Sequence, residues 1–213
     1  MTTKPKSQFV KIPNGLIRDP NLSSLEYALL VKFKLLQFIY RSDKFLINRK
    51  EHIKEPFGVA DNRTIKKSLE SLLKLEYICN EVIIDSHSIG EVHLNRKLLT
   101  MNKNYACIYG SLLRHIPTID CTGVRLVSYY ESYINRSSAI NQFCYASIET
   151  ITKETGLAKN TIIKYNKILC DKGFISVDKH KLGTDYKYDG KDKIVFSKYN
   201  NHYTVNWDKI IES

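Results

Sequence analysis

An internal repeat limits what this chain can fold into more than any single motif does. Matching residues recur at spacings of 98 and then 97 residues, in the pairs Ile53 and Ile151, Gly58 and Gly156, Asn62 and Asn160, Thr64 and Thr161, Lys67 and Lys164, and Leu72 and Leu169. In each copy a short helical segment is followed by a glycine, which tolerates positive φ, and then by an amphipathic helix. Each copy therefore predicts a helix-turn-helix unit that runs into a strand, and 213 residues accommodate two such units.

A long apolar helix is predicted near the start of the chain. Ser23 is a good N-cap, and Glu26 three residues later completes the pattern of a capping box. Residues 25–40 are apolar on most sides. Such a helix is either central to its own unit or shared with a second chain, and the second alternative leaves room for a homodimer.

Two shorter helices are predicted next. Residues 48–55 read as a helix that closes before Pro56, because proline disfavours helical backbone in the preceding residue. Asp61 is expected to cap a third helix that ends near Lys74. In the second copy, Asp120 or Thr122 is expected to cap a helix that reaches Ile134, and further helices are predicted at 147–155 and 159–172.

Each copy is predicted to end in a β-hairpin. In the first copy the strands are expected at 77–84 and 91–95, with the turn at 85–90. In the second copy a strand at 174–178 leads into a longer hairpin rich in Lys and Tyr, which closes at 202–207. Three helices followed by a hairpin is the order of a winged helix.

The predicted fold class is therefore mainly α with small β-hairpins (α+β), arranged as two tandem winged helix-turn-helix domains. A flexible tail is expected at 1–8, the first domain at 9–100 and the second at 105–213.

Charge favours a polyanionic partner. The net charge is +11, and both halves of the chain contain more Lys and Arg than Asp and Glu. Nucleic acid is favoured over a membrane surface, because the sequence shows neither a lipidation motif nor a basic amphipathic helix. Without a secretory segment or a long apolar run, we expect a soluble cytoplasmic protein. The five cysteines include no C-x-x-C pair and are expected to be buried free thiols, with Cys170 on the inner face of its helix.

The outward residues of the third helix in each copy are the candidate DNA contacts. A recognition helix lies in the major groove, where Arg can bond guanine and Asn can bond adenine, while Lys more often contacts phosphate. The predicted contacts are Asn62, Arg63, Thr64, Lys66 and Lys67 in the first copy, and Lys159, Asn160, Thr161, Lys164 and Lys167 in the second. The alternative is that these side chains form ordinary solvated helix surfaces.

The second hairpin is a further candidate contact. Lys179, Lys181 and Lys187 stand on it with Tyr186 and Tyr188 among them. Four aspartates in the same hairpin offset much of this charge, so a solvated loop is the alternative.

No motif for catalysis is found. The sequence has no phosphate-binding loop G-x-x-x-x-G-K-[ST], no G-x-S-x-G and no H-E-x-x-H, and its six His show no zinc-ligand spacing. Tyr129, Tyr130 and Tyr133 have helical spacing and are interpreted as packing residues. We therefore expect a protein without enzymatic activity, cofactor or metal.

The sequence resembles a known family in two stretches. Residues 9–26, FVKIPNGLIRDPNLSSLE, and residues 58–78, GVADNRTIKKSLESLLKLEYI, resemble winged helix-turn-helix proteins from phages and plasmids of low-GC Gram-positive bacteria. The resemblance covers most of residues 8–80 and, more weakly, residues 146–178. Some relatives are replication initiators and helicase-loader-like proteins, and others are transcription regulators. One departure is Asn166, which stands where the first copy has Leu69, so Tyr165 is expected to fill that core position and rotate the helix slightly.

The resulting prediction is a sequence-specific double-stranded DNA-binding protein with two recognition helices. A transcription regulator of a mobile element is the leading role, and a plasmid or phage replication initiator that binds origin repeats is the first alternative. Its partners are then the transcription or replication machinery. The second alternative is an adaptor whose winged helices dock proteins.

Overall fold

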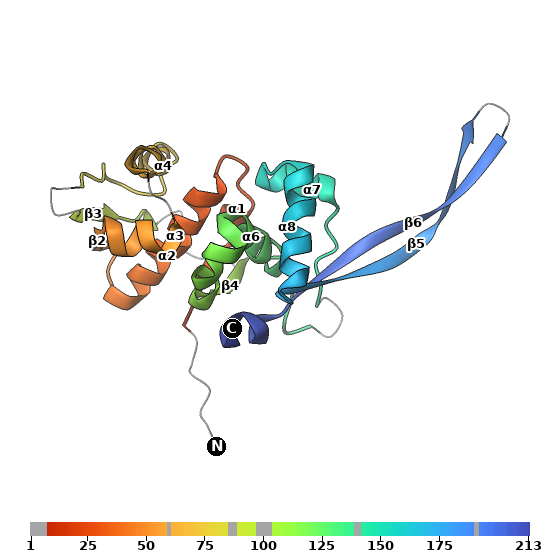
Figure 1. Ribbon diagram of the computed structural model, residues 1–213. Helices are drawn as coiled ribbons and strands as arrows, with labels where there is room; N and C mark the ends of the chain where they lie inside the picture. The colour runs from red at the N-terminus through yellow and green to blue at the C-terminus, as the bar shows by residue number, and fades with distance from the viewer. Residues whose placement is uncertain (1–7, 59–60, 85–88, 97–103, 139–141, 190–191) are drawn as a thin grey trace, which may run out of the picture.

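A computed structural model describes residues 8–58, 61–84, 89–96, 104–138, 142–189 and 192–213. The first half contains β1 (Phe9–Pro13), α1 (Asn14–Ile17), α2 (Ser24–Tyr40), β2 (Lys44–Asn48), the π-helical turn η1 (Lys50–Lys54), α3 (Glu55–Phe57), α4 (Asn62–Lys74) and β3 (Ile89–His93). The second half contains β4 (Tyr105–Tyr109), the 3-10 helix η2 (Gly110–His115), α6 (Ile116–Glu131), α7 (Ile148–Thr155), α8 (Lys159–Asp171), β5 (Ile175–Asp189), β6 (Asp192–Val205) and α9 (Trp207–Glu212). Helices and three two-stranded sheets thus form a mixed α and β fold, compatible with the predicted α+β class (Figure 1).

The two copies of the repeat meet in an antiparallel strand pair. β1 pairs with β4 so that Lys11 lies opposite Cys107. These residues are 96 positions apart, which is also the offset between two similar segments, LIRDP from Leu16 and LLRHIP from Leu112. Since equivalent residues face each other in antiparallel strands, an approximate two-fold axis passes through the middle of this pair.

A single hydrophobic core runs through both copies. α2 and α6, the equivalent long helices, pack against each other at its centre. Tyr27 and Phe33 of α2 and Val124 and Tyr130 of α6 are fully buried there. The middle of α2 is therefore covered within its own chain, which favours the first of the two predicted alternatives for this helix. Its last turn, with Phe38 to Tyr40, is exposed.

Two helix starts in the first copy follow the predicted caps. The Ser23 hydroxyl accepts from the Glu26 backbone N–H at 3.2 Å, and the Glu26 carboxylate accepts from the Ser23 N–H at 2.7 Å. Asp61 caps α4 by accepting from the Arg63 N–H at 3.0 Å. Both predicted N-caps are confirmed, because each signal depends on residues within one turn.

The predicted helix at 48–55 differs in its limits. Asn48 belongs to β2, and its side chain accepts from the N–H groups of Lys50 and Glu51. Helical backbone then continues through Pro56 as far as Phe57. The predicted stop before Pro56 was wrong, because Pro56 lies in the first turn of α3, where a missing N–H costs no helical hydrogen bond.

The first predicted hairpin is confirmed only in part: β3 includes residues 91–93 of the strand predicted at 91–95, but the other predicted strand does not form. Residues 77–84 form no strand, and only Ile78 makes an isolated bridge, to Leu94. β3 pairs instead with β2, a strand that was not predicted. Phe45 and Ile47 of β2 are buried, and a 17-residue helix precedes this strand, so its short alternating pattern was overlooked. Of the predicted turn, residues 85–88 lie outside the described residues.

In the second copy, α6 was predicted to start at Asp120 or Thr122 and to reach Ile134. It spans Ile116–Glu131, but Asp120, with a φ of 52° in the left-handed region, breaks it in two. The part after the break begins at the predicted start and ends three residues before Ile134. The described chain also contains α9, a helix that was not predicted. Asn206 is its N-cap, and the Asn206 side-chain oxygen accepts a hydrogen bond from the Lys209 N–H at 3.1 Å. The predicted strand at 202–207 therefore stops at Val205.

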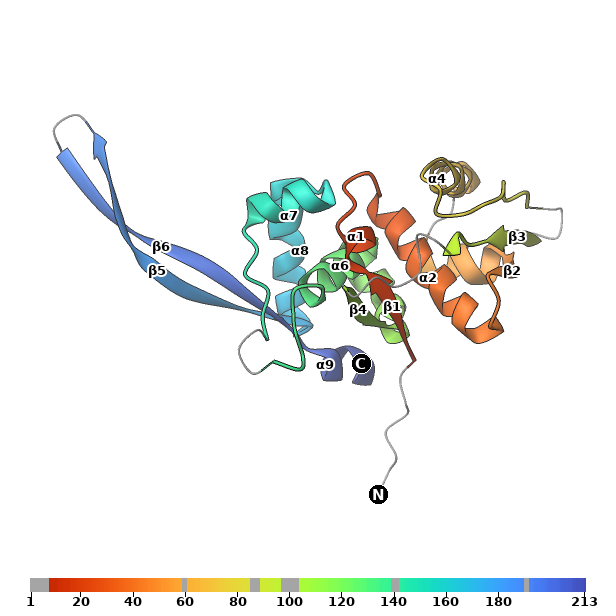
Figure 2. The same ribbon diagram turned by 180° about the vertical axis from the view of Figure 1, so that it is seen from behind.

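The long second hairpin is present as predicted, and both of its strands are continuous. β5 and β6 pair from Ile175 and Val205 outward to Asp189 and Asp192. At its base the buried ring of Tyr203 stacks on Tyr130 at 4.4 Å between centroids. Figures 1 and 2 show this two-stranded ribbon running far out from the helical body.

Candidate nucleic-acid interface

α7 and α8 form a helix-turn-helix whose helix limits are set by nearby residues in the sequence. The Ser147 hydroxyl accepts from the Thr150 N–H at 3.1 Å and caps α7. Gly156 ends α7 with a φ of 70°, and α8 begins three residues later at Lys159. The predicted limits 147–155 and 159–172 are therefore confirmed to within one residue. The turn also packs on the first copy, since a Cβ at Gly156 would lie 2.7 Å from the carbonyl oxygen of Pro20.

α4 occupies the corresponding place in the first copy. Gly58, at a φ of 63°, ends α3 as Gly156 ends α7. Residues 59–60 of the connection lie outside the described residues. On α4 the buried side chains are Ile65, Ser68, Leu69 and Leu72.

The inward positions of α4 and α8 agree closely. Ile162, Tyr165 and Leu169 are buried on α8, at the positions equivalent to Ile65, Ser68 and Leu72. Tyr165 is buried as predicted, and its hydroxyl donates to Asp120. Burial and the neighbouring Asp120 carboxylate raise the pKa of Tyr165 to about 12, so the phenol stays protonated and able to donate.

Asn166 is also accommodated inside the packed surface. It is half-buried, and its side-chain oxygen accepts a hydrogen bond from the Tyr130 hydroxyl. The polar Asn166 side chain therefore has a partner within the inward stripe, next to the buried Tyr165. The outward faces of the two helices consist of equivalent positions.

The candidate contact residues lie on these outward faces. On α4 all five predicted residues are exposed: Asn62, Arg63, Thr64, Lys66 and Lys67. On α8 four are exposed, namely Lys159, Asn160, Lys164 and Lys167, and Thr161 is half-buried. Thr64 has a local role, because its hydroxyl donates to the Asp61 carboxylate at 3.1 Å.

Two of the lysines have exposed acidic neighbours. Lys66 lies 3.7 Å from Glu70 within α4, and Lys159 lies 3.6 Å from Glu149 of α7. Pairs of this kind, with both side chains largely in water, hold their lysines weakly. Both ammonium groups can therefore exchange their carboxylate partner for a phosphate.

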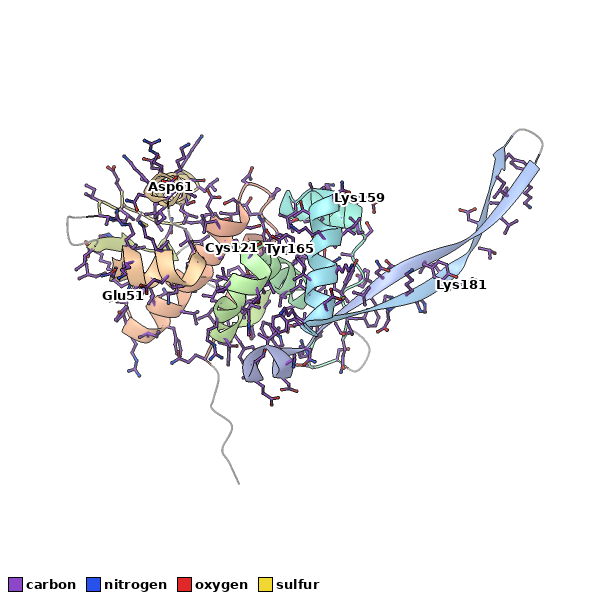
Figure 3. All side chains as sticks on the ribbon, in the orientation of Figure 1. Glu51, Asp61, Cys121, Lys159, Tyr165 and Lys181 are labelled. Carbon is purple, nitrogen blue, oxygen red and sulfur yellow. The ribbon has the colours of Figure 1, made fainter. Side chains whose placement is uncertain are left out.

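The helices α4 and α8 are oriented differently at the same edge of the molecule. In Figure 1, α4 is seen nearly along its axis, whereas α8 runs up the picture. Figure 3 places Asp61, at the start of α4, and Lys159, at the start of α8, along the upper edge. α8 thus points its N-terminal end at this edge, whereas the axis of α4 crosses the edge along the line of sight.

The helix starts also differ in charge. Asp61 caps α4, and hydrogen bonds from the Arg63 and Thr64 backbone N–H groups and the Thr64 hydroxyl lower the pKa of its carboxyl. Ala158 precedes α8 and makes no side-chain cap. The first N–H groups of α8 therefore remain open to an anion, whereas the Asp61 carboxylate occupies the start of α4.

The ribbon carries the remaining candidates. Lys179 and Lys181 are exposed on β5, and the side chain of Lys187 lies outside the described part. His180 and His202 meet across the ribbon with centroids 4.9 Å apart. Phe143 stacks on the other side of His202 at 3.9 Å, so this pair is part of a ring stack.

Arg125 was missed by the sequence reasoning. It is fully buried on α6 and donates to the backbone carbonyl oxygens of Asp19 and Leu22. No sequence signal pointed to it, because its acceptors are main-chain atoms more than 100 residues away. It holds the turn that leads into α2 against α6.

The cysteines and tyrosines have structural surroundings. All five cysteines are free, but Cys79 and Cys170 are exposed, so the predicted burial of these two was wrong. Cys170 lies near the end of α8, beyond the part of its inner face that packs. Tyr129 and Tyr130 are fully buried and Tyr133 is half-buried, as packing residues. Among the described residues, no three or more His, Cys, Asp or Glu are grouped so as to hold a metal ion.

Comparisons with known proteins agree with the geometry of α7 and α8. No helix in the described part of the chain is long and apolar enough to cross a bilayer. A search of the curated proteins found no match. A family model described as a helix-turn-helix domain matches residues 133–175, which include α7, α8 and the first residue of β5.

Proposed function

We propose that this chain is a sequence-specific double-stranded DNA-binding protein that uses two recognition helices and performs no catalysis. The observation that carries the proposal is the agreement between α4 and α8. Their inward positions match, and the equivalent pairs Thr64 and Thr161, and Lys67 and Lys164, stand on their outward sides. The helix-turn-helix match over residues 133–175 supports the same function for α8.

In this proposal α8 enters the major groove with its N-terminal end. Asn160 in the first turn is placed to bond a base edge, and Lys164 one turn later contacts a phosphate. The uncapped N–H groups behind Ala158 add a second phosphate contact. α4 contributes Arg63 as its base-reading side chain and Lys67 as its phosphate contact.

Selection of bound duplexes from a random library, followed by affinity measurements at two salt concentrations, tests the proposal. A reproducible site with two parts is expected, because two recognition helices belong to one chain. Arg63→Ala should cost roughly 1–3 kcal/mol on the selected site and relax its specificity at one position. Lys164→Gln should weaken all sequences alike and reduce the salt dependence by about one phosphate contact.

Lys172→Gln is the matched control, since Lys172 is an exposed lysine at the opposite end of α8. It should leave the affinity for the selected site unchanged. If Arg63→Ala reduces the affinity for cognate and random DNA equally, the claim of sequence readout fails. If Arg63→Ala and Lys164→Gln both leave the DNA affinity unchanged, docking of a protein partner becomes the better explanation.

For the biological role, we propose a transcription regulator of a phage or plasmid. A regulator is expected to bind one or two operators near a promoter. Mapping the selected site onto the source genome tests this role, because a cluster of repeated sites at an origin would identify a replication initiator instead.

A further inference from the structure

The ribbon of β5 and β6 has two chemically different faces. Residues directly opposite each other in an antiparallel pair share a face, and alternate residues of one strand share a face. On β6, the odd-numbered residues Tyr199, Val195 and Lys193 lie on the same face. Their partners on β5 are Lys181, Tyr186 and Tyr188, which therefore lie on that face too. One face carries Lys179, Lys181, Tyr186, Tyr188, Lys193 and Tyr199, and we call this set the lysine–tyrosine face.

A β-bulge creates this face. Lys181 pairs with Tyr199 and Gly183 pairs with Lys198, so Leu182 is an extra residue in β5. The extra residue shifts the alternation by one, which brings the even-numbered Tyr186 and Tyr188 to the same side as the odd-numbered Lys181. Without the bulge, the tyrosines and Lys181 would lie on opposite sides.

The same register separates the charges. Asp178 lies opposite His202 and Asp185 opposite Phe196, which places both aspartates on the other face. Among the side chains that the structure describes, the lysine–tyrosine face contains three lysines and no acidic residue. The aspartates that balance the hairpin in the sequence therefore do not neutralise this face.

The rings on the lysine–tyrosine face are open to water. Tyr186, Tyr188 and Tyr199 are 53%, 66% and 57% exposed. The Lys193 ammonium lies 4.1 Å from the centroid of the Tyr186 ring, so a cation and a ring of this face are in contact. Lys181, which Figure 3 labels on the ribbon, stands well away from the helical body, and these rings are not part of the core.

We propose that the lysine–tyrosine face binds single-stranded nucleic acid. Lysines spaced along a ribbon match a phosphate backbone, and exposed rings between them provide stacking surfaces for unpaired bases. Paired bases are already stacked inside a duplex and cannot reach such rings, so the tyrosines favour a single strand over a duplex. This site is separate from α4 and α8 and does not depend on the function proposed for them. A ligand would also stabilise the ribbon, because a two-stranded hairpin is marginally stable by itself.

Fluorescence polarisation of the full chain with a labelled oligothymidylate tests the inference. The double variant Tyr186→Val/Tyr188→Val removes two rings while keeping a high strand propensity. It should weaken binding at least about tenfold, the scale set by the loss of base stacking. The double variant Tyr186→Phe/Tyr188→Phe keeps the rings and should stay within about twofold of wild type, since stacking needs no hydroxyl.

Tyr145→Val is the matched control, because Tyr145 is 56% exposed and lies outside the ribbon. It should bind the oligothymidylate as wild type does. A labelled oligouridylate of the same length shows whether DNA or RNA is preferred, and binding of either one that depends on the rings supports the site.

Two results would overturn the inference. If the Val variant binds like wild type, the rings make no contact with the strand. If Val and Phe variants lose affinity equally, the hydroxyls rather than the ring faces make the contact. A labelled duplex separates the two proposals: Lys164→Gln should reduce duplex binding only, and the Val variant should reduce single-strand binding only. Parallel loss of both ligands in the Val variant would mean that the ribbon is a duplex contact and would also refute the single-strand site.

Discussion

The Arg125 guanidinium donates a hydrogen bond of 2.6 Å to the backbone carbonyl oxygen of Asp19. A second bond runs to the carbonyl oxygen of Leu22. Arg125 belongs to α6, and its two acceptors lie in the turn that leads into α2. A fully buried guanidinium needs such acceptors, and their carbonyl groups need a donor, so the contact connects the two copies of the repeat.

Arg125→Met should lower the free energy of unfolding by about 2 kcal/mol, because the buried Leu22 carbonyl loses its donor and the Asp19 carbonyl keeps only its bond from the Leu22 N–H. Arg125→Ala should cost about 1–2 kcal/mol more, since it also leaves a cavity. Urea denaturation of the full chain measures both. A methionine variant as stable as wild type would show that burying the guanidinium costs as much as its hydrogen bonds contribute.

Gly156→Ala should destabilise the protein more than Gly58→Ala, although the two glycines occupy equivalent turns. The φ of Gly58 is 63° and that of Gly156 is 70°, so an alanine at either position costs about 1 kcal/mol for its left-handed backbone. Only at Gly156 does the new Cβ meet a carbonyl oxygen, that of Pro20 at 2.7 Å. This overpacking should add roughly 1–3 kcal/mol, measured as the difference in thermal stability between the two variants. Equal losses would mean that the Pro20 turn moves aside without cost.

Ala158→Asp should stabilise the protein and weaken DNA binding. Aspartate at this position can cap the open start of α8, which is worth about 1 kcal/mol. Its charge should repel a phosphate and remove that contact. Losing one contact worth about 0.5–1.5 kcal/mol should lower the duplex affinity about twofold to tenfold. Ala158→Asn is the control, because asparagine caps equally well without a charge. If both variants bind duplex equally, no phosphate lies at this helix start.

Asp61 should make the stability of α4 depend on pH. Hydrogen bonds from backbone N–H groups lower the pKa of its carboxyl in the folded protein, so the charged cap is present above the ordinary carboxyl range. The stabilisation is lost as the pH falls through the lowered pKa. Asp61→Asn keeps an acceptor oxygen without a charge, so its stability relative to wild type should rise as the solution becomes acidic. Urea midpoints of both proteins between neutral and acidic pH measure this, and a constant difference would show that the charge contributes nothing.

Local signals in the sequence predicted the helices near the interface well. The caps at Ser23 and Asp61 form as expected, because a cap depends on a few neighbouring residues, and Ser147, expected as the first residue of its helix, caps that helix. The inward stripe of α4 follows from helical periodicity, and so does the exposure of Arg63 and Lys67 on the other side.

The pairing of strands was the main failure. β2 has an alternating pattern of only five residues, and its partner β3 lies 41 to 49 residues later, in a register that pairs Asn48 with Ile89 and Lys44 with His93. Residues 77–84 contain enough apolar residues to resemble a strand, but the protein uses them as an extended connection held by the Ile78 bridge. Whether a segment forms a strand depends on the strands that it packs and pairs with, and the local sequence does not identify these partners.

By itself, the sequence determined the repeat, the helix caps and the residues that face outward on α4 and α8, because helix formation and capping act over a few residues. Only the tertiary structure decided which strands pair, how Arg125 joins the two copies and which side of the ribbon carries the tyrosines. These features depend on the register between segments that are distant in the chain. A single extra residue at Leu182 places Lys181 and Tyr186 on one face, and this follows from the pairing with Tyr199 and Val195 rather than from the order of residues in β5.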